Sequence, residues 1–282
     1  MNSFVVKSEL KSRLDVATMA LREAQQIILY GDISSVSTKE DGSIVTNVDG
    51  KVEDIIKAIV LNQFPHDSFL GEERGFTEGT NDYLWSGDPV DGTRSFENGQ
   101  ILVSSILSLS ENGKTLLSAI LNPYSNQLYV ASEEGAFLIM NGRKFQLPKK
   151  RVEKIRNAFV NVQLSTRLTP LLEQFGMMRK EKEIDYLCLT GGSFAYNSAC
   201  VADGSQTCYV TLLDKVLADW DVRSAFHIVE TAGGLVTKLD GSPIILEDIP
   251  ESICMSNSPE VHEGLLHLIK KYKIIELSRK VA

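Results

Sequence analysis

The sequence predicts a layered protein of helices and sheets, with an α+β first part over residues 1–148 and an α/β second part over residues 149–282. Three patterns support this. Apolar residues recur at helical spacing near the N-terminus, hairpin-like runs fill the middle, and strand-like and helix-like segments alternate afterwards. A chain of 282 residues can form one large domain or two smaller ones.

Two amphipathic helices are expected first. From Ser8 to Tyr30, apolar side chains recur every three or four residues, and Gly31 is a suitable end. The segment from 49 to 64 repeats this pattern, and Pro65 stops it because proline lacks the backbone donor that a helix needs.

The middle of the chain has the pattern of an antiparallel sheet. Residues 101–110 and 115–122 are strand-like, and Glu111-Asn112-Gly113-Lys114 between them is a hairpin signal. Strands at 128–131 and 136–140 follow, with another turn at Asn141-Gly142. Pro148 and the basic residues 149–151 indicate a linker or a solvated edge.

The later segments alternate between the apolar spacing of strands and that of helices. Strands are expected at 157–162, 186–189 and 208–212. Helices are expected at 170–178, from Gly192 through Ala202, and at 219–232. This alternation predicts layered α/β packing in the second part.

Composition excludes several classes of protein. The formal net charge of −8 would repel a phosphate backbone, so nucleic-acid binding is not expected. No stretch is apolar for long enough to cross a bilayer, and residues 1–10 lack the apolar core of a signal peptide, so a cytoplasmic protein is expected. The four cysteines form no CxxC pair.

The most informative segment is Trp85 to Phe96, which contains Asp88-Pro89-Val90-Asp91-Gly92-Thr93. Pro89 stiffens the backbone, so two carboxylates on a rigid turn could converge on one hard cation. Gly92 allows close backbone approach, and a helix starting here would direct N–H groups at an anion. Ordinary Asp-Pro and Asp-Gly turns are the competing interpretation.

Two other acidic segments accompany it. Leu70-Gly71-Glu72-Glu73 ends an apolar run, and Ala218-Asp219-Trp220-Asp221 precedes an apolar helix. Each is ambiguous alone, because Asp219 and Asp221 could simply cap that helix. Other phosphatase chemistries lack support, since no Gly-x-Ser-x-Gly, Cys-x5-Arg or Walker loop is present.

Together and in this order, the three segments resemble the signatures of the inositol monophosphatase superfamily, over nearly the whole chain. That group also holds histidinol-phosphate phosphatases, bisphosphate nucleotidases and fructose-1,6-bisphosphatases. The resemblance implies a layered αβαβα sandwich, with most metal ligands in residues 1–148, and Asp221 and the substrate contacts in residues 149–282.

The resemblance also implies roles for individual residues. The expected Mg²⁺ ligands are Glu72, Asp88, Asp91, Asp221 and the backbone carbonyl of Val90. Asp49 and Thr93 are expected to orient and deprotonate the attacking water, and the N–H groups of Gly92 and Thr93 to hold phosphate. Substrate contacts are expected from Arg94, Gly192, Ser193, Phe194 and Asp214.

The implied activity is a Mg²⁺-dependent phosphomonoesterase for a small phosphorylated metabolite. Two or three Mg²⁺ ions are expected, with Mn²⁺ as a substitute and Li⁺ as an inhibitor, and relatives suggest a homodimer. Arg94-Ser95-Phe96 departs from the Thr-Asn-Phe of inositol phosphatases and is more reminiscent of the histidinol-phosphate and nucleotidase branches. Those two activities are therefore alternatives, and a catalytically weak regulatory or binding protein on the same fold is a third.

Overall fold

A computed structural model describes residues 3–40 and 42–281. They form two compact units. The first contains the chain up to Phe145, joined by the later segments Gly192–Tyr196 and Asp219–His227. The second contains Gln146–Gly191, Asn197–Ala218 and the chain from Ile228 onward.

The first unit is built on an eight-stranded sheet with the order β10-β9-β8-β7-β6-β5-β3-β4. Strand β5 pairs in parallel with β3 and antiparallel with β6, and antiparallel pairing continues from β6 through β9. The strands are β3 (Ser68–Gly71), β4 (Gly75–Thr77), β5 (Tyr83–Asp91), β6 (Ser104–Glu111), β7 (Lys114–Asn122), β8 (Gln127–Ser132), β9 (Gly135–Met140) and β10 (Arg143–Gln146).

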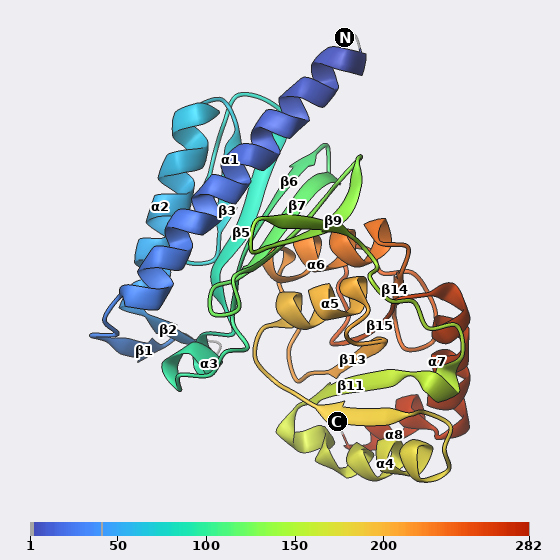
Figure 1. Ribbon diagram of the computed structural model, residues 1–282. Coiled ribbons are helices and arrows are strands. Elements are labelled where there is room, and N and C mark those ends of the chain that lie inside the picture. The colour runs from blue at the N-terminus through green and yellow to red at the C-terminus, as the bar shows by residue number, and fades with distance from the viewer. Residues whose placement is uncertain (1–2, 41, 282) are drawn as a thin grey trace. The chain divides into compact units, whose positions relative to one another are not determined.

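Two long helices cover this sheet. Helix α1 (Ser3–Tyr30) and helix α2 (Asn47–Gln63) lie side by side, and they contact β6, β7 and β5 (Figure 1). Most of the apolar side chains in the helical pattern are buried, including Leu21, Ile28 and Val52, whereas others such as Leu10 and Ile55 are half-buried. The two helices predicted from the periodicity are therefore present, although α1 begins five residues before Ser8. A short antiparallel ribbon of β1 (Val36–Thr38) and β2 (Ile44–Thr46) precedes α2.

The predicted hairpin is present, but its first strand starts at Ser104 rather than at residue 101. The reason lies in the surroundings of Ile101 and Leu102. Ile101 is 65% exposed, and the Leu102 carbonyl accepts a hydrogen bond from the Ser193 backbone N–H at 2.9 Å instead of pairing within the sheet.

The second unit contains a five-stranded sheet with the order β12-β11-β13-β15-β14. Strand β11 pairs in parallel with β12 and β13, whereas β15 is antiparallel to both its neighbours. The strands are β11 (Phe159–Leu164), β12 (Tyr186–Leu189), β13 (Cys208–Leu212), β14 (Leu235–Thr237) and β15 (Ser252–Ser256).

The helices of the later chain follow the predicted alternation up to residue 231. They are η1 (Ile155–Asn157), η2 (Thr166–Leu171), α4 (Leu172–Lys180), α5 (Phe194–Asp203), α6 (Asp219–Thr231), α7 (Pro259–Lys271) and α8 (Ile274–Val281). The patterns predict no element beyond Ala232, where the structure has β14, β15, α7 and α8. The two strands, of three and five residues, are too short to show a clear alternation.

The two units differ from the predicted division into residues 1–148 and 149–282. Asp221 and the segment from Gly192 to Phe194, expected with the second part, belong to the first unit. Hydrogen bonds from Ser86 to Asp219 and from Ser193 to Asp91 account for this placement.

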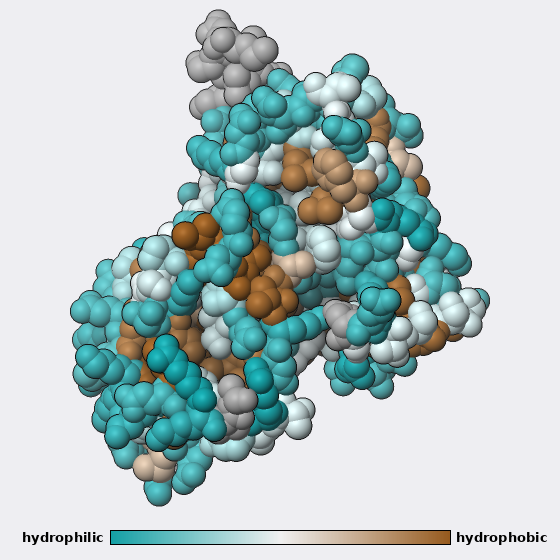
Figure 2. All heavy atoms as spheres, turned by 180° about the vertical axis from the view of Figure 1, so that it is seen from behind, coloured by the Kyte–Doolittle hydropathy of each residue, from teal (hydrophilic) through white to brown (hydrophobic). Residues whose placement is uncertain are grey.

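The surface shows the mixture of hydrophilic and hydrophobic residues that the composition of the chain leads one to expect. Hydrophilic residues cover most of the face drawn in Figure 2, and hydrophobic ones appear there as patches. Among the described residues, no helix is both long enough and apolar enough to span a membrane.

Candidate active site

The Asp88–Asp91 segment lies at the end of β5 and is not the stiff turn that its proline predicts. Strand β5 is buried from Trp85 onward, and its register with β6 shifts between Asp88 and Asp91. Pro89 explains the shift, because it cannot donate a hydrogen bond to the ladder. The Val90 N–H donates to Asp88 Oδ1 at 2.8 Å instead. Both carboxylates are consequently held in a buried strand.

Asp91 is bound to the beginning of helix α5. Its Oδ2 accepts hydrogen bonds from Ser193 Oγ at 2.5 Å and from the Ala195 N–H at 2.8 Å. Its Oδ1 accepts one from the Phe194 N–H at 3.2 Å. A carboxylate is favourable here because the first N–H groups of a helix are unpaired within it. Burial nevertheless raises the pKa of Asp91 to about 6, against the opposing effect of these hydrogen bonds.

Two glycines permit this contact. Gly92 has φ +91°, and a Cβ there would lie 2.8 Å from the Ser193 nitrogen. Gly192 has φ +81°, and its Cβ would lie 2.4 Å from the Leu102 carbonyl oxygen. Any other residue would be strained at both positions and would separate the two backbone segments.

Asp88 is surrounded by other acids. Burial raises its pKa well above the ordinary value, and the negative charges of Glu72, Asp91 and Asp221 raise it further. The fold therefore places the four predicted acidic ligands within electrostatic reach of one another, although they come from β5, from the loop after β3 and from the first turn of α6.

Lys39 supplies positive charge beside this group. Its Nζ lies 2.7 Å from Glu72 Oε1 and 2.6 Å from Glu73 Oε1. Burial alone would lower the pKa of Lys39, but the hydrogen bonds to the two glutamates raise it. Sequence reasoning missed this residue, because nothing near it in the chain distinguishes it from an ordinary exposed lysine.

Asp49 and Thr93 form the expected pair. Thr93 Oγ1 lies 3.1 Å from Asp49 Oδ1 and 3.0 Å from the Val90 carbonyl oxygen. Asp49 Oδ2 accepts from the Thr46 N–H at 2.9 Å and from Thr46 Oγ1 at 2.5 Å, within the capping box of α2. Burial raises the pKa of Asp49 despite these bonds.

A second buried acid, Glu53, was also missed. Its carboxylate accepts hydrogen bonds from the Glu73 N–H at 2.6 Å and the Arg74 N–H at 2.7 Å, so it fixes the loop that carries Glu72. Burial raises the pKa of Glu53. Its spacing of four from Asp49 places it on the same face of α2, which was a usable signal.

The predicted substrate contacts have varied surroundings. Arg94 is exposed on α3 (Thr93–Glu97), and it has no hydrogen bond or ion pair with another described residue through its side chain. Ser193 holds Asp91, and the Phe194 ring is buried against Phe226, with 6.4 Å between centroids. Asp214 belongs to the second unit, where it pairs with Arg167.

The acids do not form a preassembled metal site. Among the residues that the structure describes, no three His, Cys, Asp or Glu side chains are arranged as ligands of one ion. The hydrogen bonds of these acids explain this, because Glu72 is turned to Lys39 and Asp91 to α5. Their chemistry still suits Mg²⁺, which prefers hard oxygen donors and relieves repulsion among carboxylates.

Comparison with known proteins identifies the family and the fold of the chain. Among relatives, the chain is similar to a histidinol-phosphatase of Chlorobaculum parvum, with 30% identity over 75% of this chain and 79% of that one. It is 26% identical to a fructose-1,6-bisphosphatase/inositol-1-monophosphatase of Aquifex aeolicus, over 93% and 97% of the two chains. The solved structure of an IMPase from Thermotoga maritima matches with a TM-score of 0.80 and 26% identity, over 95% and 99% of the chains.

Fold and relatives thus define a phosphoric monoester hydrolase with an α+β layered fold. The model of the inositol monophosphatase family matches residues 5–273, so the chain belongs to that family. The predicted family and fold class are confirmed.

Proposed function

We propose that this chain is a Mg²⁺-dependent phosphomonoesterase acting on a small phosphorylated polyol, sugar or amino alcohol. One observation carries the proposal: the Asp49–Thr93 hydrogen bond belongs to the same unit as four interacting carboxylates, of which Asp88 and Asp91 are buried and Glu72 and Asp221 are half-buried. A binding protein would have no need to keep both features.

The proposed metal ligands are the side chains of Glu72, Asp88, Asp91 and Asp221 and the carbonyl oxygen of Val90. All are hard oxygen donors, and the raised pKa of Asp88, caused by burial and then by its acidic neighbours, supports a place for cations. When bound, Mg²⁺ would polarise the phosphoryl group and favour ionisation of water.

The residues of the chain would prepare the attacking water. When the Thr93 hydroxyl donates its hydrogen to Asp49, the lone pairs on Thr93 Oγ1 are left to accept a hydrogen from water. Asp49 can then receive a proton through Thr93. Its capping-box contacts with Thr46 hold the carboxylate in position for this role.

Substrate would be held by separate groups. The N–H groups of Gly92 and Thr93 are proposed to bind phosphate, while Arg94 remains open to an anionic or polar substituent. Ser193 is proposed to act mainly by positioning Asp91, since its hydroxyl already contacts that carboxylate. Contacts from Gly192, Phe194 and Asp214 remain predictions.

The test is phosphate release from a panel of phosphomonoesters, with Mg²⁺ and with EDTA. We expect activity only with the metal, and a loss of about 10²–10⁴-fold in kcat for Thr93→Ala but not for Thr93→Ser, which keeps the hydroxyl. Full activity in EDTA would refute the proposal. A parent protein without turnover on the whole panel would favour the binding-protein alternative.

A histidinol-phosphate phosphatase or bisphosphate nucleotidase is the second candidate. Arg94 favours it, because it is exposed and its side chain pairs with no other described residue, and one relative is named histidinol-phosphatase. The same panel ranks substrates by kcat/KM. Arg94→Thr should reduce selectivity for a substrate with a second charged or polar group, and unchanged selectivity would remove Arg94 from this role.

Several properties are proposed by analogy with the family alone. They are two or three Mg²⁺ ions, replacement by Mn²⁺, inhibition by Li⁺, a homodimer and a cytoplasmic location. Millimolar Li⁺ added to the assay and size-exclusion chromatography with light scattering would check inhibition and dimer formation.

A further inference from the structure

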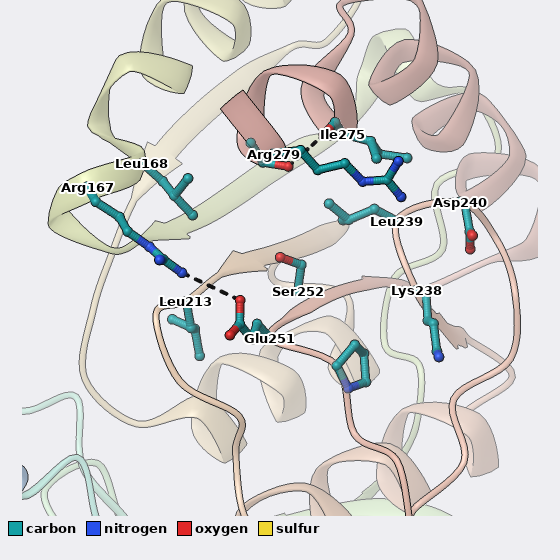
Figure 3. Close-up of a pocket in the computed structure, with 12 residues that line it drawn as sticks. Arg167, Leu168, Leu213, Lys238, Leu239, Asp240, Glu251, Ser252, Ile275 and Arg279 are labelled. Carbon is teal, nitrogen blue, oxygen red and sulfur yellow. Dashed lines mark hydrogen bonds and ion pairs between the residues drawn. The ribbon is translucent and has the colours of Figure 1, made fainter. Parts of the chain in front are cut away.

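The second unit contains a cavity of about 300 Å³ that has no part in the proposed catalysis. Its lining comes from η2, from the residues after β13 and β14, from the start of β15 and from α8 (Figure 3). Leu168, Leu213, Leu239 and Ile275 supply apolar surface, and the Ser252 hydroxyl is a polar group among them. An apolar lining with a few polar groups is typical of sites for small organic molecules.

A second cavity of about 480 Å³ adjoins the first. Four residues line both: Leu239, Asp240, Ile275 and Arg279. Each volume lies within the range of pockets that hold a small organic ligand. Arg279 therefore stands on the wall that the two spaces share.

The charge of the lining contrasts with that of the chain. The chain carries a formal net charge of −8, yet three Asp or Glu side chains line the two cavities against five Lys or Arg. The five are Arg167, Lys238, Lys270, Lys273 and Arg279. A local surplus of positive charge on an acidic protein attracts anions.

Arg279 is the cation that could bind an anion from either cavity. Arg167 is already paired with Asp214 and Glu251, and Lys238 lies 3.5 Å from Asp248. Arg279 has no hydrogen bond or ion pair with any other described residue through its side chain. Figure 3 shows it across the cavity from the joined Arg167 and Glu251.

The one acid among the four residues that line both cavities, Asp240, is also engaged. Asp240 accepts hydrogen bonds from the Ser242 N–H at 2.9 Å and from Ser242 Oγ at 2.6 Å. The Asp240 carboxylate is therefore hydrogen-bonded to Ser242 and not to Arg279. The Arg279 guanidinium is left open to a ligand.

From these observations we propose that the second unit binds a small amphipathic organic anion. Its apolar body would occupy the space between Leu168, Leu239 and Ile275, and its anionic group would pair with Arg279. A guanidinium forms two parallel hydrogen bonds with a carboxylate, phosphate or sulfonate, so it suits this role. The site is independent of the proposed catalysis, and its ligand need not be a substrate.

The probe for the test is 1-anilinonaphthalene-8-sulfonate, a fluorescent organic anion with an apolar body. The full chain should bind it saturably, with one strong site by fluorescence titration and calorimetry. Arg279→Gln should weaken binding about tenfold or more, as expected for loss of a charge-assisted contact. Arg279→Lys should retain most of the affinity.

Lys280 provides the matched control, because it is an exposed cation next on α8 and lines neither cavity. Lys280→Gln should bind the probe as the parent does, and uncharged N-phenyl-1-naphthylamine should bind more weakly than the sulfonate. Equal binding by the parent and Arg279→Gln would overturn the proposal. So would equal losses in the Arg279→Gln and Lys280→Gln variants.

Discussion

Gly192 and Gly191 are adjacent, yet only one of them is constrained. Gly192 has φ +81° and a Cβ position 2.4 Å from the Leu102 carbonyl oxygen, whereas no atom lies within 4 Å of the Cβ position at Gly191. The pair therefore offers a test of whether close backbone approach holds Asp91 in place.

We predict that Gly192→Ala is destabilising by about 1–3 kcal/mol, because alanine is strained at positive φ and would push against Leu102. Urea unfolding measures this change. Gly191→Ala is the control and should change the free energy of unfolding by less than about 0.5 kcal/mol. Equal effects at the two positions would contradict the proposed contact.

Glu53 is a second single residue with a testable effect, since its carboxylate alone fixes the loop that carries Glu72. We predict that Glu53→Gln lowers the free energy of unfolding by about 1–3 kcal/mol, because a buried backbone N–H loses its charged acceptor. The matched control is Asp54→Asn on the next residue. Its ion pair with Arg74 is exposed and should contribute less than about 1 kcal/mol.

At the scale of elements, α7 and the second sheet meet through His262. This side chain is 2% exposed, and its ring nitrogens lie 2.8 Å from Thr237 Oγ1 and from Ser256 Oγ. Burial lowers the pKa of His262 from 6.5 to about 4. The folded protein therefore keeps the ring neutral where the unfolded chain would protonate it.

This difference predicts a loss of stability in acid. Between pH 6.5 and pH 4 the unfolded state binds more protons, so the free energy of unfolding should fall by about 3 kcal/mol through His262. His262→Asn should show a smaller fall over the same interval, whatever its stability at pH 7. Urea unfolding at several pH values measures both slopes, and identical slopes would refute the assignment.

The elements also show what periodicity can and cannot predict. The buried faces of α1 and α2 and the strands at 186–189 and 208–212 follow directly from the spacing of apolar residues. Strand β5 does not, because Pro89 and the two aspartates have the composition of a turn while the tertiary structure buries them in a sheet. Tertiary packing overrides local preference in such cases.

The same limit applies to the site. The positions of Asp49, Thr93 and the four acids were inferred from a resemblance in motifs, and the structure brings them into one unit. Lys39 and Glu53 were not inferred, because their roles depend on contacts with residues 20 to 34 positions away. The spacing of Glu53 from Asp49 places both on one face of α2, but no local pattern identifies hydrogen-bond partners so far along the chain.

At the scale of the whole molecule, the positive charge of Lys39 beside Glu72 and Glu73 should affect the melting temperature of the protein. Its ammonium offsets part of the negative charge of Glu72 and Glu73. We predict that Lys39→Gln lowers the melting temperature in EDTA and enlarges the rise produced by Mg²⁺, because repulsion among the acids is then relieved only by the ion.

Differential scanning calorimetry with and without Mg²⁺ measures both quantities. Lys51→Gln is the control, since Lys51 is exposed on α2 and makes no ion pair with a described residue. If the Lys39→Gln and Lys51→Gln variants responded alike to Mg²⁺, the proposal that Lys39 and the metal both relieve repulsion among the acids would be wrong.

The two late segments of the first unit have a consequence for synthesis. Asp91 leaves the ribosome about a hundred residues before Ser193 and Ala195, and helix α6 follows later still. Until these segments emerge, the growing chain lacks the donors of Ser193, Phe194 and Ala195, so Asp91 cannot reach its folded surroundings for several seconds at about 5–20 residues per second. A nascent fragment halted near residue 150 should be more easily degraded by protease than the finished chain.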